Sequence, residues 1–140
     1  MIGNLKSLIR LNEWHVDEKR LKLGSLLRAL ENLEGQLSRL ESTLKKEQAL
    51  AAESPDEAGF LYGGYARAVI KNRRLLRAAV VNSEKEIVAA REELGEAYLE
   101  LKKYDTAQAE QDRNEAEETA RKEQAAIDEV GLQAFMHRRR

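Results

Sequence analysis

The chain of 140 residues contains no cysteine, one proline and only seven aromatic side chains, namely one Trp, four Tyr and two Phe. The lack of cysteine excludes a disulfide framework and leaves no plausible zinc ligand set, as expected in a reducing compartment. The scarcity of aromatic residues argues against a large enclosed core. No apolar run approaches the roughly 20 residues that span a bilayer, and the first residues lack a signal-peptide pattern. The sequence therefore predicts a soluble, cytoplasmic protein without direct membrane insertion.

Helix-forming and charged residues are abundant instead. Ala, Glu, Lys, Leu and Arg make up 83 of the 140 residues, more than the roughly one half that is typical of long helices and coiled coils. The net charge of −1 conceals an uneven distribution, because residues 58–83 hold five basic residues and no acid, whereas residues 105–129 hold nine acids and three bases. Such blocks indicate faces for different partners, although a solvated helix surface would have the same composition.

Two apolar stripes have the heptad spacing of a coiled coil. In the first, every seventh residue from position 2 to position 51 is apolar. The companion positions three residues later are also apolar, except at Asn12, Lys19 and Glu47. The second stripe runs over residues 62–104 and is interrupted only by Arg73 and Ser83. Each stripe predicts one long helix with an apolar seam.

A turn is predicted between the two stripes. The segment Ser54-Pro55-Asp56-Glu57 holds the only proline, a residue that can cap a helix start, and two acids that favour the positive end of a helix dipole. We therefore expect a single coiled-coil hairpin made of helix 2–53, turn 54–59, helix 60–130 and a basic tail at 131–140.

The heptads also predict how the helices pair. Folding back beside Pro55 places Leu44 opposite Val69 and Leu23 opposite Ala90, whereas a slip by one heptad moves the turn away from the proline. The expected fold is all-α: a long two-helix antiparallel coiled-coil hairpin with a C-terminal helical overhang. The overhang begins near residue 111, where partners in the first helix run out. Its weaker apolar stripe is either a docking face or part of a fraying tail.

The sequence contains no recognisable enzymatic site. His15 and His137 are the only imidazoles and belong to no metal-binding motif, while Gly63-Gly64 lacks the lysine and the preceding strand of a phosphate-binding loop. Pairs of glutamates at helical spacing arise by chance in so acidic a chain, and a two-helix rod offers no cleft to shift their pKa values. We therefore expect no enzyme, and no catalytic, cofactor-binding or metal-binding residues.

Candidate binding residues lie on the outer side of the first helix. Leu11, Trp14 and Leu21 are opposite the seam, so this helix is apolar on two sides. A Trp with two Leu neighbours on an outer face has the composition of an interface anchor. The overhang or a second copy of the chain would cover the same face equally well.

Aromatic and basic residues follow the turn. Tyr62 belongs to the seam, whereas Phe60 and Tyr65 either seal the end of the hairpin or present a surface. The acid-free stretch that begins at Arg67 and includes Arg74 could bind phosphates. However, glutamates of the facing helix can neutralise these arginines, and a pI near 6.2 lacks the basic footprint of a nucleic-acid-binding protein. We therefore expect no nucleic acid and keep both arginines as candidate residues for a protein partner.

Two segments carry a family resemblance. They are the opening Leu8-Ile9-Arg10-Leu11-Asn12-Glu13-Trp14-His15-Val16-Asp17-Glu18-Lys19-Arg20 and the turn region Ser54-Pro55-Asp56-Glu57-Ala58-Gly59-Phe60-Leu61-Tyr62-Gly63-Gly64-Tyr65-Ala66. In a chain of this length with an Arg-rich end, they resemble the FliJ family of flagellar export proteins. The resemblance covers nearly the whole chain.

The resemblance implies an antiparallel coiled coil similar to the central stalk of rotary ATPases, within the flagellar type III export apparatus. Members of the family engage the export ATPase ring with the end that carries both termini, and contact the export gate membrane protein and export chaperones through the rod. Carried onto this chain, the terminal end presents Leu11, Trp14 and Leu21. The gate-facing surface near the turn includes Tyr62, Tyr65 and Arg67.

The expected function is that of a non-catalytic stalk and adaptor, monomeric when free and peripherally associated with the cytoplasmic face of the inner membrane. The alternative is a generic cytoplasmic coiled-coil scaffold or dimerisation protein without an ATPase partner. Solution mass separates the two, because a hairpin is monomeric and elongated whereas an intermolecular coil doubles in mass with concentration.

Overall fold

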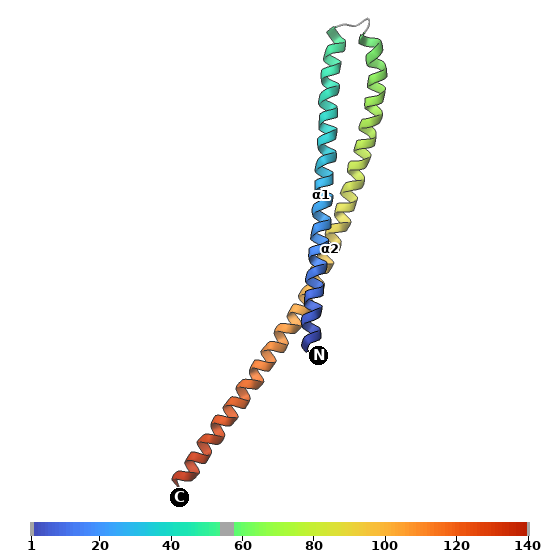
Figure 1. Cartoon of the computed structure of the whole chain (residues 1–140). Coiled ribbons are helices and arrows are strands. Elements are labelled where there is room, and N and C mark those ends of the chain that lie inside the picture. The colour runs from blue at the N-terminus through green and yellow to red at the C-terminus, as the bar shows by residue number, and fades with distance from the viewer. Residues whose placement is uncertain (1, 54–57, 140) are drawn as a thin grey trace. The chain divides into compact units, whose positions relative to one another are not determined.

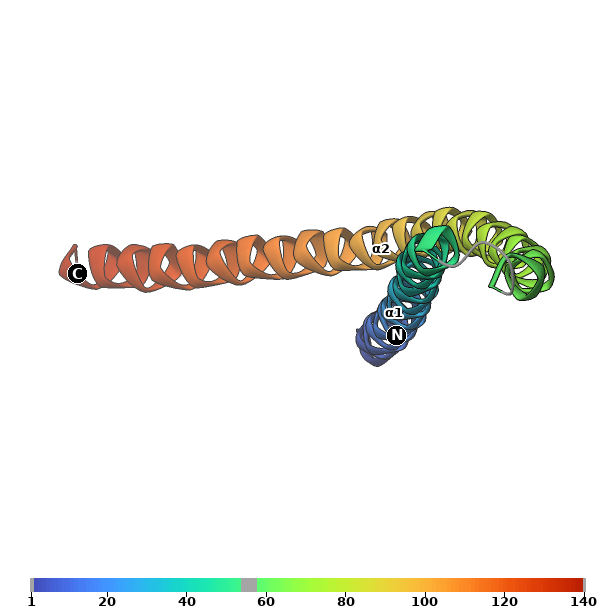
Figure 2. The ribbon, with the colours of Figure 1, turned by 90° about the horizontal axis from the view of Figure 1, so that it is seen from above.

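The computed structural model describes residues 2–53 and 58–139, nearly all of which lie in two long helices. Helix α1 spans Ile2–Glu53 and helix α2 spans Ala58–Arg138, and no strand occurs among the described residues (Figure 1). Side chains are described for residues 4–53 and 63–139. Figure 2 shows α2 from above as one unbroken helix. The predicted all-α fold is therefore confirmed.

The only proline lies between the two helices, at position 55. Consequently, no residue within α1 or α2 lacks a backbone N–H donor or forces a kink against the preceding turn. The predicted turn at 54–57, with its expected cap, lies outside the described residues. Each helix can therefore continue until the sequence around position 55 or the end of the chain stops it.

Helix α2 is longer than the sequence analysis predicted. It begins at Ala58 rather than at residue 60, and it continues to Arg138 through residues expected to form a basic tail. Gly131 is the one glycine in that stretch and costs only about 1 kcal/mol relative to Ala. His137 and Arg138 in the last turn interact favourably with the negative end of the helix dipole. The basic residues therefore end a helix, and the expectation of a separate tail was wrong for 131–138.

The chain divides into two compact units, each with parts of both helices. The hairpin unit is Val16–Ala97, and the terminal unit is Met1–His15 together with Tyr98–Arg140. In the hairpin unit, α1 and α2 run antiparallel (Figure 1). Ion pairs between their side chains join the two helices. Every predicted seam position of this unit with a described side chain is buried or half-buried. The most deeply buried are Val16, Leu44, Val69, Ser83, Ile87 and Ala90.

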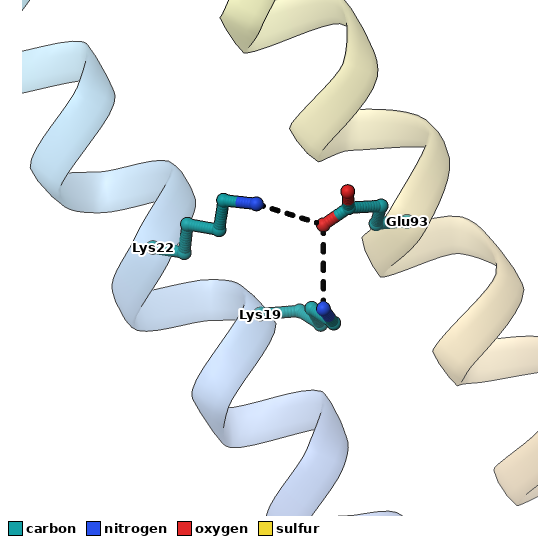
Figure 3. A network of polar contacts seen from close by, with 3 residues as sticks. All are labelled: Lys19, Lys22 and Glu93. Carbon is teal, nitrogen blue, oxygen red and sulfur yellow. Dashed lines mark hydrogen bonds and ion pairs between the residues drawn. The ribbon is translucent and has the colours of Figure 1, made fainter.

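Polar contacts between the helices bear on the register within the hairpin unit. When Leu23 lies opposite Ala90, Glu93 lies opposite residue 20, between Lys19 and Lys22. The Glu93 carboxylate accepts hydrogen bonds from both lysine Nζ atoms, at 3.3 Å from Lys19 and 3.1 Å from Lys22 (Figure 3). A slip by one heptad would move both lysines away from this position. The contacts of Glu93 fit the predicted register, whereas Arg77 contacts Glu41, five residues from the position that this register places opposite it.

In the terminal unit, the half-buried positions of α2 end at Gln111. The half-buried residues of α2 in this unit are Leu101, Tyr104, Gln108 and Gln111, all at seam spacing. From residue 112 to residue 139, every side chain is exposed. We call residues 112–139 the unpaired segment. It corresponds to the helical overhang that the heptads predicted, and no described residue of α1 covers it.

Candidate interaction surfaces

The described residues include several exposed surfaces. Among them, no group of three or more His, Asp or Glu side chains is arranged to hold a metal ion. Within the same residues, neither helix has a stretch long and apolar enough to cross a membrane. The described residues carry one interhelical cluster of three charged side chains and several exposed apolar or basic faces.

Glu93 forms the charge cluster with the two lysines of α1. Hydrogen bonds from Lys22 and then Lys19, reinforced by their positive charges, lower the pKa of the Glu93 carboxyl below its ordinary value. The three side chains are all partly exposed, so solvent screens much of this attraction. A carboxyl held in its charged form is unsuited to donating a proton near neutral pH. We therefore interpret the cluster as a clamp between the helices.

Two predicted binding residues form an exposed apolar face in the terminal unit. Leu11 is 49% exposed and Trp14 is 58% exposed, and their spacing of three residues places them on the same side of α1. The centres of the Trp14 and His15 rings are 5.2 Å apart, and the rings are tilted by 59°. Leu11 also borders a shallow groove lined by Asn4, Ser7 and Leu8. We call Leu8, Leu11 and Trp14 the terminal apolar face.

The structure excludes one alternative for this face, namely that the unpaired segment covers it. It also places the third predicted residue, Leu21, in the other unit. The unpaired segment belongs to the same unit but leaves Leu11 and Trp14 exposed, so it does not cover them. Leu21 belongs to the hairpin unit, where it is more exposed than any other large apolar side chain described. Each of the three is therefore available to a partner.

The predicted residues near the turn do not share one face. Arg67 and Arg74 are both exposed and lie one heptad apart, on the same side of α2. Tyr65 is half-buried and precedes Arg67 by two residues, which places it about 200° around the helix. The side chain of Tyr62 lies outside the described residues. The structure therefore brings the two arginines together and leaves Tyr65 on nearly the opposite side.

The two arginines differ in what they contact. The Arg67 Nε atom donates a hydrogen bond to the backbone oxygen of Gly63 at 3.3 Å. Arg74 has no ion pair with any described residue, whereas nearby Arg77 contacts Glu41 of α1 at 3.3 Å. The expected neutralisation by facing glutamates therefore applies to Arg77, whereas neither Arg67 nor Arg74 has an ion pair with a described residue.

Two exposed apolar regions were missed by the sequence analysis. Val81 and Val88 continue the row of Arg67 and Arg74 at heptad spacing, and each exposes at least half of its surface. We call these four residues the outer row of α2. Testing heptad positions outside the seam would have found it. The second region is the end of α2, with exposed Leu132, Phe135 and Met136, which the sequence analysis had treated as tail.

Two long antiparallel helices that bury apolar positions at heptad spacing define a coiled-coil hairpin protein. The family model described as flagellar FliJ protein matches residues 1–140, the whole chain. The chain therefore belongs to the FliJ family, a non-catalytic component related to flagellar protein export. No curated protein and no solved structure matches it.

Proposed function

We propose that this chain is a stalk and adaptor of the flagellar export ATPase ring, located at the cytoplasmic face of the inner membrane. The observation that carries the proposal is the terminal apolar face, where Leu11 and Trp14 are both about half exposed. Tryptophan is enriched among the residues that dominate binding energy, and grouped apolar side chains on a helix surface mark interaction sites. A family of non-catalytic export components supplies the context for such a partner.

The mechanism follows from the symmetry of the two partners. A pair of helices has no six-fold symmetry, so inside a six-membered ring it makes different contacts with each subunit. Different contacts bind some subunit conformations more tightly than others and shift the ring toward those states. The stalk thereby favours ring assembly and biases the occupancy of the nucleotide sites without performing chemistry itself.

The adaptor role rests on the other faces. Exposed Arg67 and Arg74, one heptad apart, give α2 a basic side that suits acidic segments of the export gate or of export chaperones. Tyr62 and Tyr65 remain candidate residues for the same partners, although Tyr65 would contribute from a different side of the helix. These contacts use residues of the hairpin unit and leave the terminal apolar face to the ATPase.

Turnover of the export ATPase tests this function. Adding the purified chain should raise turnover as the ring assembles. The double variant Leu11→Ala with Trp14→Ala should need at least about tenfold more protein for the same response, because truncating a dominant interface residue costs about 2 kcal/mol. Leu50→Ala is the matched control, since Leu50 is an exposed apolar residue of α1 in the other unit. It should leave the response unchanged.

Two outcomes would contradict the proposal. An unchanged response in the double variant would show that the terminal apolar face does not bind the ATPase. A wild-type chain that never stimulates the ATPase, but doubles in solution mass as its concentration rises, would support the coiled-coil scaffold instead. Sedimentation equilibrium of the free chain distinguishes these cases, because the stalk is expected to be monomeric.

A further inference from the structure

The end of α2 carries an exposed apolar stripe. Val130, Leu132, Phe135 and Met136 are each more than half exposed. At 100° per residue, Leu132, Phe135 and Met136 point within one sector of about 100°, and Val130 lies apart from them, beyond Gln133 and His137. No described residue covers this stripe, although it is as wide as one that normally packs against another surface.

The same turns carry positive charge and no negative charge. Glu129 is the last acid in the sequence, and His137, Arg138 and Arg139 follow the apolar residues. Neither arginine has an ion pair with a described residue. The Arg139 guanidinium carbon lies 5.0 Å from the centre of the Phe135 ring. A cation stacked on a ring presents apolar surface and charge together, as side chains do at the boundary between lipid headgroups and acyl chains.

We propose that residues 130–139 bind the surface of a membrane that contains anionic lipids. The proposal deepens the proposed function, on which it rests only for the location beside a membrane. The apolar side chains enter the boundary below the headgroups, and Arg138 and Arg139 contact lipid phosphates. Ten helical residues measure about 15 Å, about half of a bilayer core of roughly 30 Å. The helix end therefore lies on the surface and does not span.

The preceding sequence limits the contact to these last turns. Residues 105–129 hold nine acids against three bases, and an anionic surface repels such a segment over about a Debye length. Within that segment, Glu117 and Glu118 already contact Arg121 and Lys122 of the same helix, so few of its cations remain for lipid. The charge reversal after Glu129 thus marks where binding begins.

Sedimentation of the full chain with vesicles tests the charge requirement. The chain should bind vesicles of equimolar phosphatidylglycerol and phosphatidylcholine, bind less as salt is added, and bind phosphatidylcholine alone only weakly. Arg138→Glu should lower the partition coefficient about thirtyfold, because it changes the charge by two at about 1 kcal/mol each. Arg113→Glu is the matched control, since this exposed arginine lies in the acidic part of the unpaired segment. It should have little effect.

A second pair of variants tests the apolar requirement. Phe135→Ser should lower the partition coefficient at least about tenfold, given about 1.5–3 kcal/mol for full burial of such a side chain. Leu99→Ser removes an apolar side chain of greater exposure from the same unit and should change little. A chain carrying Trp14→Phe and Phe135→Trp reports the contact directly, because its single tryptophan should fluoresce further to the blue on anionic vesicles.

Several results would overturn the lipid proposal. These are no sedimentation with either vesicle, equal binding to neutral vesicles, or unchanged binding of the Arg138 and Phe135 variants. If Phe135→Ser instead abolishes ATPase stimulation while vesicle binding persists, the end of α2 is a protein-docking element. Failure of the proposed function is separable, because it concerns the response to Leu11→Ala and Trp14→Ala, which the vesicle experiment does not measure.

Discussion

The hairpin unit and the unpaired segment are both helical for different physical reasons. In the hairpin unit, Val69, Ile87 and Ala90 of α2 are at most 5% exposed, and burial against α1 stabilises the helix. In the unpaired segment no side chain is buried. Most helical stability in proteins comes from packing an apolar face, so the second region must depend on local interactions instead.

Those local interactions can be identified in the unpaired segment. Glu117 contacts Arg121 and Glu118 contacts Lys122, each at a spacing of four residues. Gln124 Nε2 donates a hydrogen bond to Asp128 Oδ1 at the same spacing, with a length of 2.9 Å. Such pairs contribute about 0.2–0.5 kcal/mol each. One helix therefore combines a part stabilised by packing against α1 with a part stabilised by local pairs alone.

The largest expected effect comes from placing a charge in the packed part. Ile87→Asp buries a carboxylate that has no partner at the seam and should lower the free energy of unfolding by roughly 3–5 kcal/mol. Val88→Asp is the adjacent control, because Val88 is 56% exposed whereas Ile87 is 5% exposed. It should change stability by no more than about 0.5 kcal/mol. Chemical denaturation followed by circular dichroism measures both. Equal losses would mean that the seam is not the core.

Amide hydrogen exchange should sharpen the same comparison. Amides of the hairpin unit on α2 should exchange with an opening free energy close to that of global unfolding, whereas those of residues 112–139 should open for about 0–1 kcal/mol. A deletion of residues 112–140 should lower the total helix signal without moving the unfolding midpoint of the hairpin unit. Slow exchange in the unpaired segment of the free, monomeric chain would show that something covers it.

The packed part was predictable because heptad spacing is read directly from the sequence. Polar Lys19 and Arg73 fall at seam positions and are half-buried like their apolar neighbours, so the spacing decided burial even where residue type argued against it. An antiparallel pairing beside Pro55 leaves few choices of register. The clamp at Glu93 was not predicted, since a contact between long charged side chains requires the geometry of both helices.

The outer faces were predicted less well. Leu11, Trp14 and Leu21 stood out because apolar residues opposite a seam are few in that part of α1. Val81 and Val88 were not predicted. They continue the outer row of α2 after Arg67 and Arg74, so the row as a whole is not apolar and does not form an apolar stripe in the sequence. The end of α2 was expected to be a basic tail at 131–140, although nothing in residues 131–138 except Gly131 opposes a helix. Charge indicates where a chain meets solvent or partners and says little about its backbone.

A smaller effect is expected from a buried polar atom where pairing ends. Gln108 Nε2 donates to Asp112 Oδ1 at 2.9 Å, but its Oε1 atom is buried and accepts no hydrogen bond from any described residue. Gln108→Leu removes this cost and should stabilise the paired part of the terminal unit by about 1 kcal/mol. Gln124→Leu removes an equivalent hydrogen bond to Asp128 that is exposed to solvent. This control variant should not stabilise the chain. Amide hydrogen exchange near residue 104 measures the effect of each variant on the paired part. Equal effects of Gln108→Leu and Gln124→Leu would contradict the prediction.

The smallest expected effect distinguishes an ion pair between helices from one within a helix. Glu93→Gln should slightly lower the unfolding midpoint near neutral pH, because Lys22 and Lys19 lose a charged partner. Glu118→Gln removes a pair within α2 alone and should leave that midpoint unchanged. Added salt should reduce the difference in unfolding midpoint between wild type and Glu93→Gln, since these side chains are partly exposed.

The pH dependence of that difference has a definite sign. The pKa of Glu93 is lower in the folded chain than in the unfolded chain, because both lysines favour its charged form. Its contribution is therefore complete above the unfolded pKa of about 4.3 and is lost as the pH falls through the lower folded value. Wild type and Glu93→Gln should thus converge in acid and separate toward neutral pH. A difference that is constant with pH, or that grows in acid, would mean that Glu93 contributes by packing and that charge does not clamp the two helices.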